Sequence, residues 1–144
     1  CALMTARLEK FPDMHIYHYA SYEKTRLTVM AKRHDTALAC VERLKDGVLV
    51  DLYSTVMKGV KVGLPSYSLK ALEALYFEPN TRSGIAGGGE SVVAFSDYSQ
   101  AVASDDQATA QRIKSSILNY NRIDCFSTQA LRDWLLEAAK NPRV

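Results

Sequence analysis

The sequence has few cysteines and no long apolar run. Its three cysteines, Cys1, Cys40 and Cys125, are odd in number and none shows C-x-x-C spacing, so neither a disulfide framework nor a zinc knot is indicated. We therefore expect a reducing, cytoplasmic setting. No run of roughly 18 apolar residues occurs, because even the apolar window 47–57 is interrupted by Asp51. This absence excludes a membrane-spanning helix.

A strong charge of one sign is also absent. The formal net charge is +2 and the pI is near 8.4, whereas nucleic-acid-binding domains often exceed a pI of about 9. The glycines of residues 84–89 are not followed by Gly-Lys-Ser/Thr, so they form no phosphate-binding loop. What is present is an ordinary globular composition in 144 residues, which predicts a single domain over 1–144.

Hydrophobic periodicity predicts a chain dominated by helices. Residues 14–19 are rich in β-forming side chains around Ile16 and give the one convincing strand. Residues 48–57 are ambiguous, because they could begin as a strand, and we predict a helix from about 51. Further helices are expected at 1–10, 21–33, from about 36 to the terminating Gly47, and at 68–75, 91–102, 106–120 and about 121–139, with a glycine-containing loop at 79–90.

A lone strand makes this inventory incomplete. Its unpaired backbone groups need hydrogen-bond partners. Residues 48–52 could pair with residues 14–19, but a two-stranded sheet is itself marginal. The chain also opens at Cys1 within an apparent amphipathic helix. We therefore expect the rest of the sheet to be supplied by a segment outside this chain.

Two short runs gather side chains that could carry chemistry. Glu23 follows the predicted strand and falls in the first turn of a helix, where the helix dipole favours a carboxylate. Tyr120 and Asp124 are four residues apart and share a helix face. Without other information, Glu23 and Asp124 are as well explained as solvated helix carboxylates, and Tyr120 as a packing aromatic.

The two runs resemble known motifs. Residues 120–124, Tyr-Asn-Arg-Ile-Asp, resemble the Tyr-x-x-x-Asp motif of the tyrosine-type four-acidic-residue (DEDDy) exonucleases. Residues 18–23 resemble their middle motif, with Tyr19 where asparagine is usual and Glu23 where aspartate is usual. The sequence as a whole is similar to predicted RecB-family nucleases with a ribonuclease H-like domain. The likeness continues through 50–53, 65–72 and 89–94 and spans about 13–136.

The resemblance implies an α/β ribonuclease H-like parent fold, of which this chain is a predominantly helical part with one or two strands. It also implies a 3′–5′ exonuclease, associated with DNA repair, that uses two Mg²⁺ or Mn²⁺ ions. Glu23 and Asp124 are then metal ligands, and Tyr120 positions the attacking water. The family's other two carboxylates form an Asp-x-Glu, which occurs nowhere in this sequence. We therefore expect the chain to be inactive alone.

A non-catalytic helical module is the alternative. Such a module would bind nucleic acid or a helicase partner, whereas the enzyme would also need the missing N-terminal nuclease segment. In either case DNA is favoured over RNA as the nucleic acid. Basic side chains around the central loop could meet its phosphate backbone, although solvated surface lysines are commoner; they are Lys58, Lys61, Lys70 and Arg82.

The remaining reactive side chains receive structural interpretations. His15 and His18 have no carboxylate at metal-ligand spacing. Cys125 has no histidine near it in the sequence, and we expect it to be a buried free cysteine.

Overall fold

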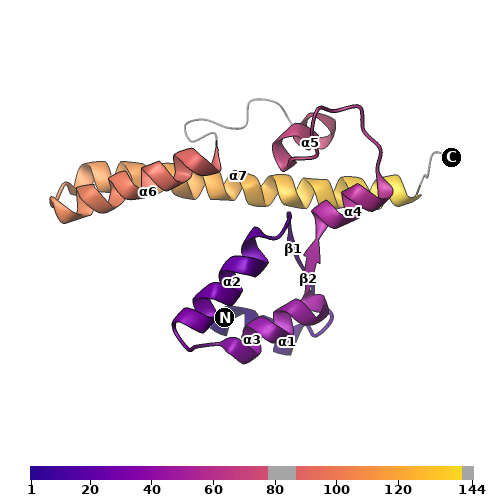
Figure 1. The fold of residues 1–144 in the computed structure, drawn as a ribbon, viewed down its shortest axis with the longest axis horizontal. Helices are drawn as coiled ribbons and strands as arrows, with labels where there is room; N and C mark the ends of the chain where they lie inside the picture. The colour runs from indigo at the N-terminus through magenta and orange to yellow at the C-terminus, as the bar shows by residue number, and fades with distance from the viewer. Residues whose placement is uncertain (78–86, 141–144) are drawn as a thin grey trace.

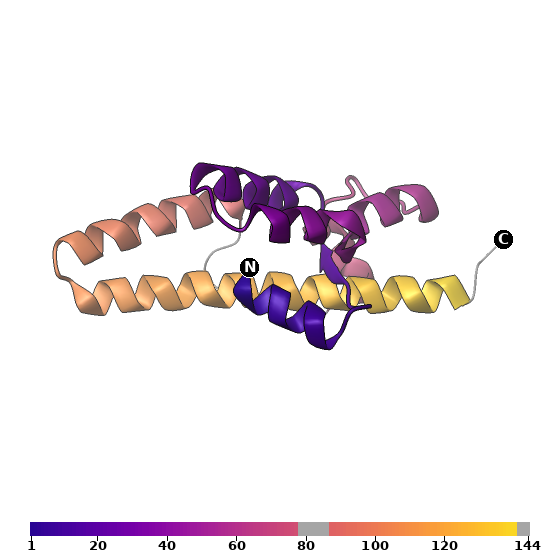
Figure 2. The same cartoon turned by 90° about the horizontal axis from the view of Figure 1, so that it is seen from below.

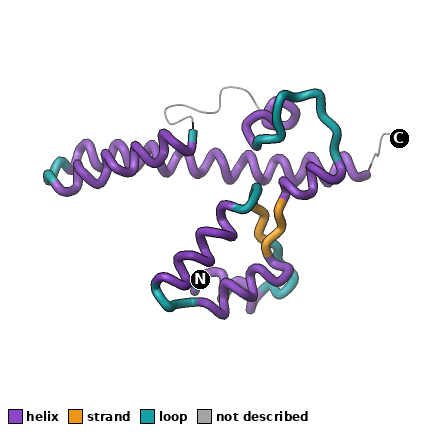
Figure 3. Tube along the Cα trace, viewed as in Figure 1, coloured by secondary structure: helices purple, strands orange, loops and turns teal. Residues whose placement is uncertain are grey.

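The computed structural model describes residues 1–77 and 87–140. These residues form a mostly helical molecule with one small sheet (Figures 1 and 3). The elements, in chain order, are α1 (Ala2–Lys10), β1 (Ile16–His18), α2 (Tyr22–Arg33), α3 (Leu38–Arg43), the π-type turn η1 (Leu44–Val48), β2 (Leu49–Asp51), α4 (Leu52–Gly59), α5 (Leu69–Tyr76), α6 (Gly88–Ala103) and α7 (Gln107–Lys140).

The long helix α7 runs through the whole length of the molecule. Helix α6 packs along its first half as a helical hairpin, and α4 and α5 contact its second half (Figures 1 and 2). The two strands connect this layer to a lower group made of α1, α2 and α3 (Figure 1). The strand β1 also contacts α7 directly. The carboxyl end of β1 therefore lies beside the long helix.

Most predicted helices are confirmed, with small shifts at their ends. The helices predicted at 1–10, 21–33 and 68–75 are observed as α1, α2 and α5. Gly47 ends the α3–η1 segment as expected, because it adopts a φ of 88° that residues with a Cβ atom rarely adopt.

The sheet has two strands, so the pairing of residues 48–52 with residues 14–19 that the sequence left open is the one observed. Residues 49–51 form β2, which runs parallel to β1 with Ile16 opposite Leu49, Tyr17 opposite Val50 and His18 opposite Asp51. The predicted helix follows directly as α4.

Two hydrophobic clusters explain why this small sheet is stable. One has a buried centre of Leu52, Val56, Leu72 and Leu131, and Tyr17 and Val50 of the sheet pack against it. The other has a buried centre of Leu8, Leu44 and Val48, and Ile16 and Leu49 pack against it. Because alternate residues of a strand point to opposite faces, both faces of the sheet are covered, as is usual for parallel strands.

Two other boundaries differ from the prediction. The pieces expected at 106–120 and 121–139 form the single 34-residue helix α7, which contains no glycine or proline to interrupt it. Helix α6 begins at Gly88 rather than at residue 91, so the predicted loop is shorter at its end. Most of that loop lies outside the described residues. Among the described helices, none is both long and apolar enough to cross a membrane.

Candidate functional site

Glu23 lies where the sequence predicted it, in the first turn of α2 just after β1. Its side chain is 52% exposed, and its Oε2 atom is 3.9 Å from Nδ1 of His18. His18 is the last residue of β1 and is buried. His18 is therefore a buried side chain, as its structural interpretation implies, but it also lies beside the Glu23 carboxylate in the first turn of α2.

Asp51 occupies the matching position at the carboxyl end of β2. It is opposite His18 in the sheet register and caps the N-terminus of α4, where its Oδ1 accepts a hydrogen bond from the Tyr53 amide at 3.0 Å. The same Oδ1 accepts a hydrogen bond of 2.9 Å from the amide of Ala20 in the β1–α2 turn. From its place near the start of this predicted helix, Asp51 was expected to form hydrogen bonds within the core, and an aspartate directly before a helix is also a recognised N-cap signal.

Tyr120 and Asp124 lie near the middle of α7, on one face and partly buried. The ammonium of Lys70 in α5 is 5.4 Å from the centre of the Tyr120 ring, a cation–π contact. The backbone carbonyl of Asp124 accepts a hydrogen bond of 2.8 Å from the Thr128 hydroxyl. The Tyr120–Asp124 face is therefore directed towards α5.

Residues one and two turns further along α7 fix how this helix sits on the sheet. Ser127 is fully buried, and its hydroxyl is 3.2 Å from the hydroxyl of Tyr76 in α5. Leu131 is also fully buried and belongs to the cluster against which Tyr17 of β1 packs. Since Asp124 and Leu131 are seven residues apart, they share a helix face about 10 Å apart along the axis. The face of α7 that carries Asp124 is thus the one that packs against α5 and the sheet.

Tyr19, which stands where the resembling family usually has asparagine, is engaged in packing. Its hydroxyl donates to the backbone carbonyl of Tyr67, and its ring meets that of Tyr53 edge to face, with centres 5.5 Å apart. Burial raises the pKa of Tyr19 to about 12, with smaller contributions from Tyr76, Tyr53 and Asp51. Tyr19 is therefore a neutral structural side chain over the physiological pH range.

Three of the four predicted basic side chains lie among the described residues. Lys58 and Lys61 are exposed at the end of α4 and just beyond it, whereas Lys70 lies over Tyr120. Arg82 lies outside the described residues. All three cysteines are free, and Cys125 is exposed, so the expectation that Cys125 is buried was wrong. It lies on α7 next to Asp124.

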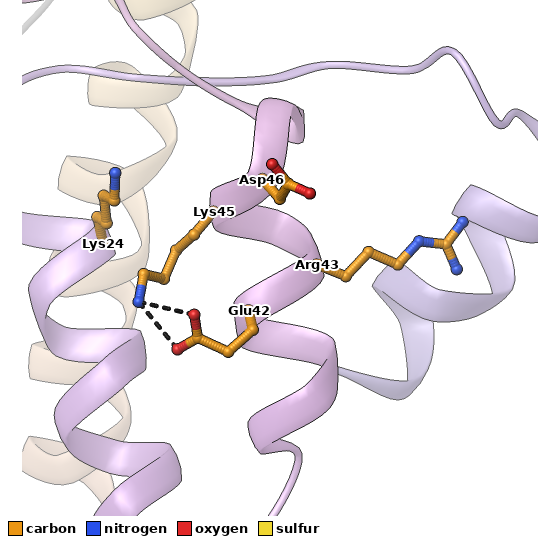
Figure 4. Close-up of a pocket in the computed structure, with 5 residues that line it drawn as sticks. All are labelled: Lys24, Glu42, Arg43, Lys45 and Asp46. Atoms are coloured by element: carbon orange, nitrogen blue, oxygen red, sulfur yellow. Dashed lines mark hydrogen bonds and ion pairs between the residues drawn. The ribbon is translucent and has the colours of Figure 1, made fainter.

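A shallow hollow lies between α2 and the α3–η1 segment (Figure 4), and neither Tyr120 nor Asp124 lines it. Its volume is about 600 Å³ and its lining is entirely charged; the lining residues are Lys24, Glu42, Arg43, Lys45 and Asp46. Lys45 is already paired with Glu42 through contacts of 2.9 and 3.1 Å. A hollow with opposite charges paired inside it has no pronounced preference for an anion or a cation.

The carboxylates present do not make a complete metal centre. Within residues 1–77 and 87–140, no three side chains among histidine, cysteine, aspartate and glutamate are grouped so that they could hold a metal ion. Both oxygens of Asp51 accept hydrogen bonds from protein groups, Oδ2 from the Ser54 hydroxyl at 3.0 Å. The described residues thus do not fit a two-metal site on their own.

Comparison with known proteins identifies the family. The family model described as the RNase_H superfamily matches residues 2–136, which is nearly the whole chain. Searches of curated proteins and of solved structures find no match. The superfamily indicates a nuclease-type function directed at nucleic acid, and its nucleases generally use divalent metal ions. The chain belongs to the RNase H superfamily, and it forms a predominantly helical part of that α/β fold with a two-stranded parallel sheet.

Proposed function

We propose that this chain is part of a metal-dependent 3′–5′ exonuclease of the DEDDy type, similar to RecB-family nucleases and acting on DNA. The observation that carries the proposal is the placement of the two motifs. The Glu23 turn follows β1, and the helix that bears Tyr120 and Asp124 packs on the same strand. From these contacts we propose that the Glu23 turn and the Tyr120–Asp124 face meet at the carboxyl end of β1, the end of parallel strands where ligands bind.

Glu23 and Asp124 are proposed as two of four carboxylate ligands, and Tyr120 as the group that orients the attacking water. Divalent ions, when bound, would stabilise charge on the attacking and leaving oxygens of the phosphodiester. The other two carboxylates are assigned to an Asp-x-Glu outside these 144 residues, since the sequence contains none. The 144-residue chain alone is accordingly proposed to be inactive, as one partial ribonuclease H-like domain.

The test compares this chain with a version extended upstream by about 60 to 100 residues, enough to complete a domain of ordinary size. Calorimetric titration with Mg²⁺ and Mn²⁺ is combined with cleavage of single strands labelled at the 5′ end, in DNA and RNA forms. The extended chain is expected to bind metal and to produce a ladder that shortens from the 3′ end. Failure of both chains to bind metal and cut would refute the proposal.

Substitutions in the extended chain test the role proposed for each site residue. In the extended chain, Glu23→Gln and Asp124→Asn are expected to abolish cleavage and weaken metal binding, because each removes a charged ligand. Tyr120→Phe is expected to lower kcat and leave metal binding unchanged. Glu9→Gln and Asp133→Asn are the controls, since both are exposed carboxylates on α1 and α7 respectively. Equal loss in the control variants would contradict the assignment.

A non-catalytic module is the second candidate. It is favoured by the lack of a group of three metal-ligating side chains in the part of the chain that the structure describes. In this case the chain would bind nucleic acid or a helicase without cutting. Binding of labelled DNA that is independent of Mg²⁺ and unaffected by Asp124→Asn, with no cleavage by the extended chain, would establish the module.

A further inference from the structure

The turn between β1 and α2 is short and strained. Only three residues separate the end of β1 at His18 from the start of α2 at Tyr22. The middle one, Ala20, has a φ of 61°, in the left-handed region that is costly for a residue with a Cβ atom. Such a conformation persists only where the surrounding groups hold it in place.

Two side chains hold both backbone groups of Ala20. Its N–H donates to Oδ1 of Asp51 at 2.9 Å. Its carbonyl oxygen is 2.6 Å from Nδ1 of His18. A carbonyl can only accept a hydrogen bond, so Nδ1 of His18 carries the hydrogen and donates it. The two side chains are opposite one another in the sheet register. We name His18, Asp51 and the Ala20 backbone the Ala20 clamp.

The clamp is tied into the rest of the fold through Asp51. Oδ1 of Asp51 also accepts from the Tyr53 amide at the start of α4, and Oδ2 accepts from the Ser54 hydroxyl. One carboxylate thus links the β1–α2 turn to the first turn of α4. Charged acceptors make stronger hydrogen bonds than neutral ones, which suits a group that restrains strained backbone.

The position of Glu23 depends on this turn. Glu23 is three residues beyond Ala20, and its side chain is too exposed to be fixed by packing. The backbone direction on leaving the turn therefore decides where its carboxylate lies. The imidazole of His18 lies next to both Ala20 and Glu23, since the Nδ1 atom that bonds to the Ala20 carbonyl is also 3.9 Å from Oε2 of Glu23.

We infer that His18 and Asp51 are positioning residues that lock the β1–α2 turn and so place the Glu23 carboxylate. This inference rests on the proposed function for the role of Glu23, whereas the clamp itself is defined by contacts that exist without metal or substrate. Neither residue is a metal ligand in this assignment. They act through Ala20, so their effect is separable from loss of Glu23 itself.

Three variants separate the clamp from the other duties of Asp51. Asp51→Ser keeps a good N-cap for α4, but its shorter side chain no longer reaches the Ala20 amide. Asp51→Asn keeps the accepting Oδ1 and is the conservative rescue. Ser54→Ala removes only the bond to Oδ2 and is the matched control.

The first readout is the hydrogen-exchange rate of the Ala20 amide, measured by NMR in the 144-residue chain. Asp51→Ser is expected to speed this exchange at least tenfold, whereas Asp51→Asn and Ser54→Ala stay near the wild-type rate. Adding Ala20→Gly to Asp51→Ser is expected to restore much of the lost stability, because glycine adopts the left-handed conformation freely. Unchanged Ala20 exchange in Asp51→Ser would overturn the clamp.

The second readout is Mn²⁺ affinity and the cleavage rate of the upstream-extended chain. Asp51→Ser is expected to weaken Mn²⁺ binding about tenfold and to lower kcat while KM stays within twofold, and Asp51→Asn is expected to recover both. If Ala20 exchange accelerates but Mn²⁺ affinity and kcat do not change, the positioning role is overturned. If the wild-type extended chain binds no Mn²⁺, the proposed function fails and the positioning role with it, while Ala20 exchange still decides the clamp.

Discussion

The two halves of the candidate site are built in different ways. The half that carries Glu23 is a short turn whose geometry is set by polar contacts from His18 and Asp51. The half that carries Tyr120 and Asp124 is a helix whose position is set by burial of Leu131 against the sheet. A polar turn responds to small changes of geometry, whereas a packed helix responds to loss of buried volume. Substitutions in the two halves are therefore expected to have effects of different size and kind.

The largest loss of stability is expected from Leu131→Ala. Leu131 is fully buried where α7 meets the sheet, α4 and α5. Truncation of such a leucine costs about 2 to 5 kcal/mol, which should appear in the free energy of unfolding measured with urea. The control on the same helix is Leu136→Ala, because Leu136 is 56% exposed; its effect should stay within about 0.5 kcal/mol. Equal losses would mean that α7 does not pack as described.

Removing the Tyr76–Ser127 hydrogen bond should have a smaller effect. The two hydroxyls are 3.2 Å apart and join α5 to the buried side of α7. Tyr76→Phe should lower the free energy of unfolding by about 1 kcal/mol. The double variant with Ser127→Ala should lose less than the sum of the two single variants, because both remove the same bond. Strict additivity in urea unfolding would show that the two hydroxyls do not interact.

The contact of Lys70 with Tyr120 is expected to contribute less again. Lys70→Met keeps the aliphatic part of the side chain and removes the ammonium that lies over the ring. This substitution should lower the free energy of unfolding by about 0.5 to 1 kcal/mol, and it should have no effect in a Tyr120→Leu background. Lys58→Met is the control, since Lys58 is exposed on α4. A double-mutant cycle that shows no coupling would mean that Lys70 does not interact with Tyr120.

Ionisation of Tyr19 should affect stability only at alkaline pH. Its pKa is raised by burial from 10.0 to about 12, so below pH 10 the folded and unfolded states both keep the proton. Between pH 10 and about 12 the unfolded state releases the proton and the folded state keeps it, so the free energy of unfolding falls as pH rises. The fall should be less steep in Tyr19→Phe. Identical pH profiles for the two proteins would contradict this.

The sequence predicted the elements whose signals are local. Gly47 ended its helix because a left-handed φ is required there, and Glu23 and the Tyr120–Asp124 pair were placed on their helices by spacing alone. The strand β2 was only an alternative from the sequence, because residues 49–51 are ambiguous by themselves. It is covered by Leu52 and Val56 on one face and by Leu44 and Val48 on the other, a condition that no local pattern reveals.

The contacts that hold the candidate site were also beyond the sequence pattern. The bond from Ala20 to Asp51 spans 31 positions and depends on the register of two strands, one of which was not expected. The contact of Lys70 with Tyr120 depends on how α5 lies on α7. In contrast, the continuity of α7 was predictable, because no glycine or proline occurs between Gln107 and Lys140. Asn119 and Asn121 are only weak helix formers and do not break it.

The most direct test of the account is whether the two halves meet at one metal site. NMR spectra of the upstream-extended chain are recorded during addition of Mn²⁺, whose unpaired electrons broaden signals of nearby nuclei. Signals around Glu23 and around Asp124 are expected to disappear at the same Mn²⁺ concentration, while those around Gln107, about 25 Å along α7 from Asp124, persist. Broadening around only one of the two carboxylates, or equally around Gln107, would contradict a shared metal site.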